Sequence, residues 1–323
     1  MRKFKFILTI SSAFMLMAAY AQEPDKVLVK VQYSYIHIND TTKKNRPHIE
    51  NMLLLAGKNA SLYLSNDMID QSINGEIRQQ QIAKNGLTNQ QTKSAGQISD
   101  AMQVSFTQYF FFNKERKFFT MEDMPVDKCL VEDNIDEIDW RIVKDTLSFL
   151  GIHCQKATAR YKGRNWIAWF STEFPFEAGP WKLHGLPGLI IAANDDKMEV
   201  QFKFNGIQNI KTGDLISDKA NELPADMIKK ITDRLAGFSY ASGLVLDKIA
   251  LPPPREARLG GYVNITQKDF DKLKAAYAKD YEGVRNAQVA ARYTNMGMSP
   301  PAIRNVPHSE PAKSDINNPI ELP

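Results

Sequence analysis

The chain of 323 residues lacks most of the motifs by which catalytic and metal sites are recognised. It has no phosphate-binding P-loop, no dinucleotide-binding glycine pattern and no Gly-x-Ser-x-Gly turn of the serine hydrolases. Its five histidines are scattered, with no pair at i, i+4 and no Cys-x-x-Cys beside them. The sequence therefore predicts no catalytic residue, no cofactor and no metal ligand.

A strong net charge is lacking as well. The chain carries 41 Lys and Arg against 37 Asp and Glu, and three of the basic residues, Arg2, Lys3 and Lys5, precede an N-terminal apolar run. Without them the count is 38 against 37, which is close to neutral. No basic cluster accompanies an aromatic platform, so we expect no nucleic-acid partner.

The only long, mostly apolar run covers residues 6–18. It follows the basic residues and precedes Ala19-Tyr20-Ala21, which fits the small-x-small pattern of signal-peptide cleavage. We expect residues 1–21 to be a secretory signal peptide cut before Gln22, rather than a retained N-terminal anchor. The mature protein is then exported, periplasmic or outer-membrane-associated, with no transmembrane segment.

Cysteine is scarce, since Cys129 and Cys154 are the only two. In an exported protein an even pair usually forms a disulfide, and closing a loop of about 25 residues stabilises by roughly 3–4 kcal/mol. Two buried free thiols are an alternative. A catalytic Cys154 with His153 or His184 as base is disfavoured, because neighbouring side chains of a strand point to opposite faces. We predict the disulfide.

The chain is instead rich in short strand patterns. Alternating or aromatic runs begin at Val27 and recur as far as Phe204, with turn residues every eight to twelve positions, which is typical of an antiparallel meander. Beyond residue 210 the apolar spacing becomes helical; one helix is expected to end at Gly237 and another to begin near Thr266. The predicted fold is α+β, a curved antiparallel β-sheet with C-terminal helices.

The expected divisions follow these changes of pattern. The sheet domain covers residues 22–210 and contains a polar, Gln- and Asn-rich insertion at 66–100. A mainly helical segment, 211–294, is expected to pack on the sheet. Residues 295–323 are predicted to be an extended, Pro-rich tail.

Residues 179–190 combine three glycines, two prolines and a tryptophan ahead of an apolar segment. In Leu186-Pro187-Gly188-Leu189, the proline pre-sets φ for position i+1 of a type II turn, and Gly188 would take the positive φ of position i+2. We therefore expect a rigid corner between strands at 166–170 and 189–193.

Three of the four tryptophans, Trp166, Trp169 and Trp181, lie within sixteen residues. On a strand Trp166 shares its face with Phe170, while Trp169 points to the other side. The cluster is interpreted either as core packing or as the wall of a groove for an apolar or peptide ligand. The candidate groove residues are Arg164, Trp166, Trp169, Gly179, Pro180, Trp181, Gly185, Leu186, Pro187, Gly188, Leu189 and Ile190. For Arg164 itself, an ion pair with an acid such as Glu173 or stacking on an indole is favoured over ligand binding.

Several motifs together resemble the GLPGLI family, exported proteins of Bacteroidetes. They are Gly151-Ile152-His153-Cys154-Gln155-Lys156-Ala157-Thr158, Lys162-Gly163-Arg164, Trp166-Ile167-Ala168-Trp169-Phe170, Gly179-Pro180-Trp181, Gly185-Leu186-Pro187-Gly188-Leu189-Ile190 and the terminal Asn318-Pro319-Ile320-Glu321-Leu322. The match is strongest over residues 140–200. The resemblance implies export but no established activity, cofactor or catalytic residue. By analogy alone, the sheet and helices are similar to the half-barrel of lipoprotein carriers such as LolA.

Three hypotheses of function follow. The first is a non-catalytic exported envelope protein that binds an apolar or peptide-like ligand, or a periplasmic or outer-membrane partner protein. The second is a cell-envelope hydrolase, which needs two acids or a Cys–His pair converging from Cys154, Glu173, His184 and Asp195. The third is a copper-handling protein that uses Met296, Met298 and His308.

Overall fold

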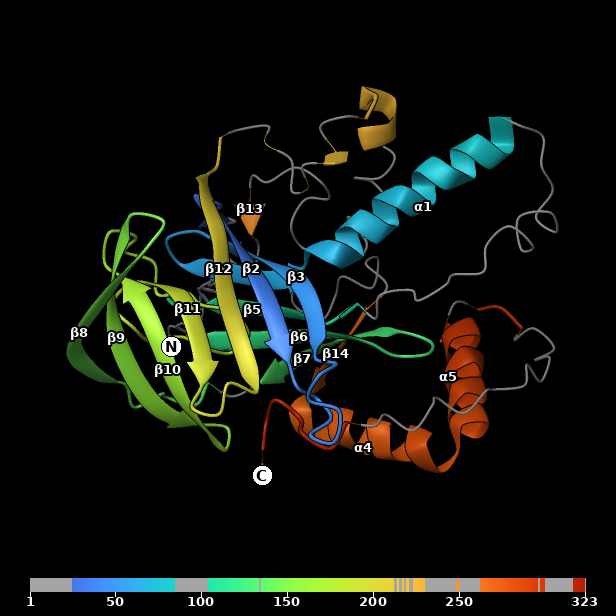
Figure 1. The fold of residues 1–323 in the computed structure, drawn as a ribbon. Helices are drawn as coiled ribbons and strands as arrows, with labels where there is room; N and C mark the ends of the chain where they lie inside the picture. The colour runs from blue at the N-terminus through green and yellow to red at the C-terminus, as the bar shows by residue number, and fades with distance from the viewer. Residues whose placement is uncertain are drawn as a thin grey trace, which may run out of the picture.

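The computed structural model describes residues 25–84, 104–133, 135–211, 214, 217, 219–220, 223–229, 248–249, 262–295, 297–299 and 316–322. All the described strands except one short pair belong to one open, curved sheet of twelve strands in the order β14-β7-β6-β5-β4-β3-β2-β12-β11-β10-β9-β8 (Figure 1). The predicted α+β class with a curved sheet is confirmed. The sheet is mixed rather than purely antiparallel, because β14 returns from the C-terminal part of the chain and pairs in parallel with β7.

The strands of this sheet are β2 (Val29–His37), β3 (His48–Ala56), β4 (Ala60–Ser65), β5 (Gln108–Phe112), β6 (Lys117–Asp123), β7 (Lys128–Asp133), β8 (Arg141–Phe149), β9 (Ile152–Tyr161), β10 (Arg164–Ser171), β11 (Leu189–Asp195), β12 (Val200–Asn209) and β14 (Tyr262–Thr266). The two-residue strands β1 (Asp25–Lys26) and β13 (Lys248–Ile249) form a separate antiparallel pair. The helices are α1 (Asn66–Lys84), α4 (Gln267–Lys279) and α5 (Tyr281–Asn295).

The sheet consists of two meanders joined side by side. Strands β2 to β7 follow one another in space as they do in the chain, and so do β8 to β12. The junction is the long antiparallel pairing of β12 with β2, from Val200 opposite His37 to Asn209 opposite Val29. A meander was therefore predicted correctly within each half, while the pairing that joins the halves was not.

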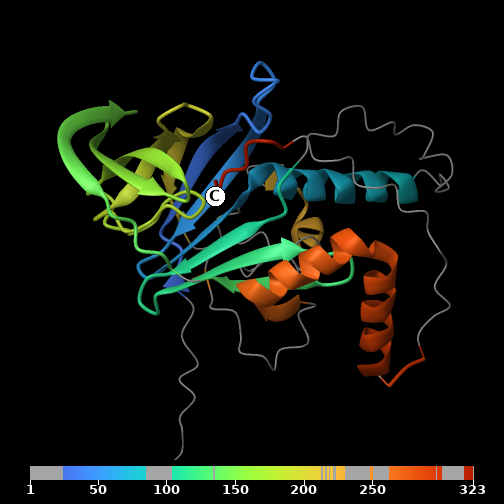
Figure 2. The ribbon, with the colours of Figure 1, turned by 90° about the horizontal axis from the view of Figure 1, so that it is seen from below.

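Both faces of the central strands are buried, which explains the unbroken apolar run Met52–Ala56 in β3. Leu53 and Leu55 belong to one core with β4, β5 and α1, while Met52 and Leu54 belong to a second core with β9 to β12. We call these two sides the α1 face and the loop face. Seen from below (Figure 2), α1 and α4 lie on opposite sides of strands β5 to β7.

Helix α1 covers the α1 face. The hydroxyl of Ser65 accepts a hydrogen bond from the backbone N–H of Met68 at 3.0 Å, as an N-cap residue does. Met68, Ile69 and Ile73 are buried against Leu53 and its neighbours. The polar insertion thus begins with a helix, and its second part, 85–100, lies outside the described residues.

Helix α4 begins where the sequence pattern placed it. Thr266 is the N-cap, and its side chain accepts from the backbone N–H of Asp269. Phe270 packs with Cys129 and Val131 of β7 on the loop face of the sheet. The helix predicted to end at Gly237 and the signal peptide at 1–21 fall largely or wholly outside the described residues, and the domain boundaries stay predictions. No helix in the described part of the chain has both the length and the apolarity needed to cross a membrane.

The predicted disulfide is absent, because both cysteines are free and buried in different places. Cys129 packs against Phe270 in a small cluster, whereas Cys154 of β9 belongs to the large core of the loop face. Strands β7 and β9 lie near opposite ends of the strand order. Burial raises the pKa of both thiols to about 11, which identifies them as packing residues.

We expect both thiols to react slowly with iodoacetamide in the folded protein. At pH 8 a thiol of pKa 11 is ionised about a hundredfold less than an ordinary one, so alkylation slows by about two orders of magnitude or more. Mass spectrometry after denaturation without reductant should then show two alkyl groups. If the denatured protein, kept without reductant, takes up no alkyl group, then Cys129 and Cys154 do form a disulfide.

Candidate functional site

The loop between β10 and β11, residues 172–188, covers the loop face and carries the glycine- and proline-rich stretch. The corner in it is real, but it is not the type II turn that we predicted. Gly188 has no positive φ; its N–H donates to Leu186 O at 2.7 Å, which closes a three-residue turn around Pro187. Glycine is required at this position because a Cβ would lie 2.3 Å from the carbonyl oxygen of Ser171.

The loop supplies much of the core on this face. Pro180, Leu183, Leu186, Leu189 and Ile190 are buried, and Gly179 lies so close to the backbone and to Ile190 that no Cβ fits. The N–H of Ile190 donates to Ala178 O at 2.9 Å, which fixes the loop to the strand that follows. These motif residues therefore have a packing role.

The tryptophans separate as the strand pattern predicted. Trp166 is buried between Phe202 and Trp181, and its indole N–H donates to Tyr161 O at 3.1 Å. Trp169 points to the other side of β10, where it packs edge-on against Phe149. Trp169 is therefore not part of the same wall as Trp166.

Trp181 has two unfavourable features at once. Its φ is +55°, which is rare for a bulky residue, and no hydrogen bond of good geometry reaches its buried Nε1 in the described structure, although the Tyr109 hydroxyl lies near it. Such backbone strain costs about 1–3 kcal/mol, and an unsatisfied buried donor costs a similar amount. Strained and unsatisfied groups gather at functional sites, so Trp181 marks this region as a candidate.

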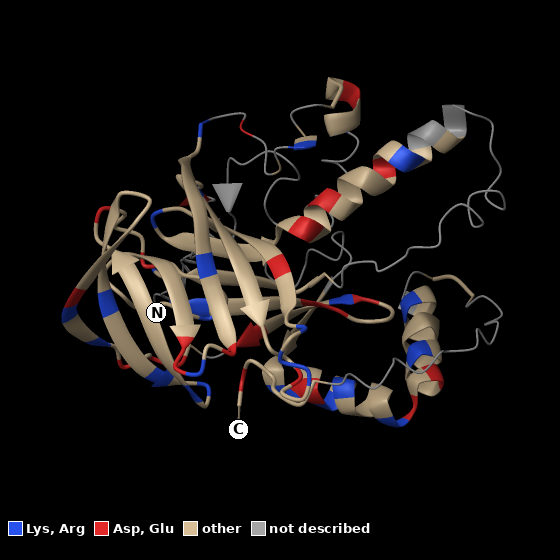
Figure 3. Ribbon diagram, viewed as in Figure 1, with Lys and Arg blue, Asp and Glu red and all other residues tan. Residues whose placement is uncertain are grey.

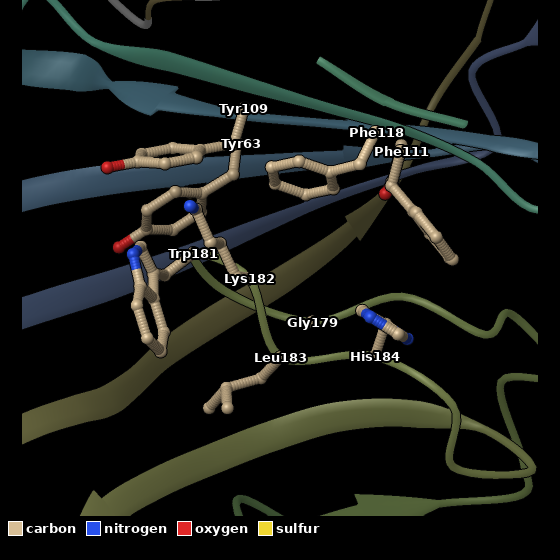
Figure 4. A pocket seen from close by; sticks show the side chains of 10 residues that line it. Tyr63, Tyr109, Phe111, Phe118, Gly179, Trp181, Lys182, Leu183 and His184 are labelled. Atoms are coloured by element: carbon tan, nitrogen blue, oxygen red, sulfur yellow. The ribbon is translucent and has the colours of Figure 1, made fainter. Parts of the chain in front are cut away.

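Trp181 lines a small pocket of about 10 Å³, enough for one water molecule (Figure 4). The buried hydroxyl of Tyr63 likewise has no hydrogen-bond partner among the described residues. Figure 4 shows the Tyr63 and Tyr109 hydroxyls and the Trp181 ring nitrogen directed to the same side. Tyr109 and Lys182 line both this pocket and a larger opening next to it.

The larger opening, which we call the charged groove, has a volume of about 450 Å³. Its walls come from β5 to β7, the turn between β9 and β10, the loop 172–188, α4 and the C-terminal residues. The residues that line it are Tyr109, Thr120, Glu122, Val131, Asp133, Lys162, Lys182, Gln267, Phe270, Asp271, Lys274 and Glu321. Three lysines and four carboxylates thus surround one opening, and α4 alone carries both signs of charge (Figure 3).

Lys182 forms two ion pairs at the wall of the groove. Its ammonium group lies 2.8 Å from Asp133 Oδ2 and 2.9 Å from Glu321 Oε1. Burial opposes its charge, but the two carboxylates outweigh this effect and raise the pKa of Lys182. Lys182 therefore stays a cation and links the loop both to β7 and to the end of the chain.

Glu122 is the carboxyl group of the groove most affected by its surroundings. Burial raises the pKa of Glu122, while a hydrogen bond donated by the Thr107 hydroxyl at 3.0 Å to Oε2 acts in the opposite direction. Lys274 faces the same opening from α4 and pairs with Asp271 at 3.1 Å. Lys162 pairs with Asp136 at 2.5 Å, so all three lysines of the groove are ion-paired with carboxylates of this chain.

Arg164 lies beside this region with a different partner from the one expected. It is buried and forms an ion pair with Asp195 at 2.6 Å, and Glu199 is 3.4 Å away. Glu173 instead accepts a hydrogen bond from the backbone N–H of His153. The remaining guanidinium hydrogens are donated to residues 318–320 at the end of the chain.

The sequence reasoning missed the groove, since Tyr109, Glu122 and Lys274 were not among its candidates. These residues come from strands and a helix far apart in the chain, so no spacing relates them. Of the predicted candidates, the stretch around Trp181 and Arg164 lie next to the groove. Asp195, which the hydrolase hypothesis names only as a possible acid, is 1% exposed and pairs with Arg164.

The side chains named for the hydrolase hypothesis do not pair with one another, and the hypothesis stays a prediction. No hydrogen bond joins any two of the side chains of Cys154, Glu173, His184 and Asp195, all of which are described. For the copper hypothesis, Met296 and His308 lie outside the described residues. Within the described part of the chain, no three His, Cys, Asp or Glu residues gather as a metal site.

Comparison with known proteins identifies no family for this chain. No family model and no curated protein matches the chain. The structure of PNGF-II in space group P21 is similar over 76% of this chain and 33% of that chain, with 10% identity and a TM-score of 0.43. A second PNGF-II structure, in space group C2, covers 59% and 29%, with 11% identity and a TM-score of 0.38. The chain spans about a third of the length of PNGF-II, and likeness at this level carries no argument about function.

Proposed function

We propose that this is an exported envelope protein that binds a polar, peptide-like ligand in the charged groove without transforming it. The observation that carries the proposal is the opening of about 450 Å³ with three lysines and four carboxylates around it. Its size lies in the range of small-molecule sites, and its two signs of charge fit a ligand with both an amino and a carboxyl group.

An apolar ligand is less well supported. The half-barrel analogy with carriers such as LolA would place such a ligand in the hollow of the curved sheet. On the loop face of this sheet, Trp166, Trp181 and Leu183 are buried in one continuous core. The charged groove, which lies next to this core, is lined mainly by polar and charged residues. The N-terminal signal pattern and the motifs shared with the GLPGLI family support export and membership of that family, which we include in the proposal.

The test is calorimetric titration with short peptides. We expect tripeptides with free ends to bind more tightly than the same tripeptides with acetylated and amidated ends, because only the free ends carry both charges. Added salt should weaken binding, since the groove is open to solvent. Recovery of the peptide after incubation should show it uncleaved.

Two lysines of α4 provide matched variants. Lys274 lines the groove and pairs with Asp271, while Lys272 pairs with Asp269 in the same i, i+3 manner outside it. We expect Lys274→Ala to weaken peptide binding by about tenfold, as loss of a charged hydrogen bond does. Lys272→Ala should leave binding unchanged. Equal affinities for the two variants, or blocked peptides binding as well as free ones, would contradict the proposal.

A further inference from the structure

The last described residues, 316–322, form a segment that is held as a separate peptide would be. We call it the terminal segment; it joins no strand of the sheet. In Figure 1 it lies beside the turn that follows β2, and the backbone N–H groups of Asn317 and Asn318 both donate to Asn39 O at 3.1 Å. Near its other end, the N–H of Leu322 donates to Lys162 O at 3.0 Å.

The centre of the segment is bound by Arg164. The guanidinium group donates to Asn318 Oδ1 at 2.6 Å, to Pro319 O at 2.7 Å and to Ile320 O at 2.9 Å. Two of these three acceptors are main-chain carbonyls, which is how proteins bind extended peptides. A planar guanidinium suits this task, because its donors have fixed directions.

The side chain of Asn318 supplies the specificity. It is 5% exposed, and its amide nitrogen donates to Ile38 O at 2.7 Å and to Glu199 Oε2 at 3.1 Å. His37 holds the main chain of the same residue, with Nε2 at 2.8 Å from Asn318 O. The ring nitrogen must be the donor there, because a carbonyl oxygen only accepts.

The groups that hold the segment are positioned without it. Arg164 is already paired with Asp195, and Asp195 Oδ1 accepts from the N–H of Glu199 at 2.7 Å and of Val200 at 3.0 Å. The buried cation therefore keeps a partner when the segment is away. The hydroxyl of Tyr35 lies 3.0 Å from His37 Nδ1, and both residues belong to β2. This contact therefore orients the imidazole ring whether or not the terminal segment is bound.

We propose that this Arg164 cradle, formed by Arg164, His37, Ile38, Asp195 and Glu199, is a peptide-recognition site with the terminal segment as its exchangeable ligand. The ligand class is an extended peptide in which an asparagine precedes a proline. Gly163 fits this role, since a Cβ there would lie 2.6 Å from Leu322 Cβ and block the path of the peptide. The bound terminal segment also places the carboxylate of Glu321 next to the ammonium group of Lys182, at the wall of the charged groove.

The test uses the folded full chain with a protease recognition sequence inserted between residues 312 and 313. After cleavage, a fluorescent synthetic peptide of residues 314–323 is added in hundredfold excess, and exchange is followed by anisotropy. We expect the severed tail to be replaced while circular dichroism shows the chain still folded. This result does not depend on what the charged groove binds.

Two adjacent asparagines give matched peptides. The Asn318→Ala peptide should bind about tenfold or more weakly, because it loses one buried and two partly buried hydrogen bonds. The Asn317→Ala peptide also loses three hydrogen bonds, two from Thr41 and one to Asp40, but Asn317 is exposed, so this peptide should bind more tightly than the Asn318→Ala peptide. A tail that never exchanges, an Asn318→Ala peptide that binds as tightly as the native one, or a cleaved chain that unfolds would each overturn the proposal.

Discussion

Replacing Arg164 by alanine is expected to lower the free energy of unfolding by about 3–5 kcal/mol. The substitution leaves the carboxylate of Asp195, which is 1% exposed, without its cation. It also leaves Asn318 and the carbonyls of residues 319 and 320 without their donor. The N–H groups of Glu199 and Val200 still reach Asp195, so the loss should lie toward the lower end of this range.

Urea denaturation followed by tryptophan fluorescence measures this change. Arg160→Ala is the matched control, because Arg160 is exposed on β9 and lies opposite Asn165 in the ladder next to Arg164. A surface change of this kind should alter stability by no more than about 0.5 kcal/mol. If Arg164→Ala cost no more than Arg160→Ala, the buried ion pair would not be a structural element of the fold.

Replacing Gly188 by alanine is expected to destabilise the protein by about 3 kcal/mol or more. The new methyl group would lie 2.3 Å from the carbonyl oxygen and 2.8 Å from the carbonyl carbon of Ser171, and both are backbone atoms. Ser171 is paired with Leu189 in the β10–β11 ladder, so relief of the clash requires the two strands to part.

Gly75→Ala is the control for the glycine substitution. Gly75 lies inside α1 with nothing within 4 Å of the added Cβ. Alanine is the better helix former, so this variant should gain about 0.5–1 kcal/mol. The two variants should therefore shift the urea midpoint in opposite directions. A Gly188→Ala protein as stable as the native one would refute the close approach of the loop to β10.

The local parts of this fold were predictable from sequence, and the contacts between distant parts were not. A period of two residues shows which side chains share a face, as it did for Trp166 and Trp169. It does not show which strand lies alongside, because pairing depends on register and neighbours. The pairing of β2 with β12 and the parallel addition of β14 are contacts of this kind.

The two corrected details have the same physical origin. Pro187-Gly188 suits more than one tight turn, and the backbone of Ser171 decides which one forms. Cysteine count and compartment favour a disulfide, but a bond also needs close Cα atoms, and the sheet holds Cys129 and Cys154 in separate clusters. Likewise, the sequence contains many acidic residues that could pair with Arg164, and only the folded sheet brings Asp195 next to it.

The most direct measurement of ligand binding in the charged groove is native mass spectrometry of the protein isolated from the cells that naturally produce it. The account predicts an adduct of roughly a few hundred daltons, matching the size of the opening, that is polar and is released by denaturation. The Lys274→Ala protein should lack this adduct, and the Lys272→Ala protein should keep it. A bare chain in every preparation, or a lipid-like adduct retained by Lys274→Ala, would contradict the account.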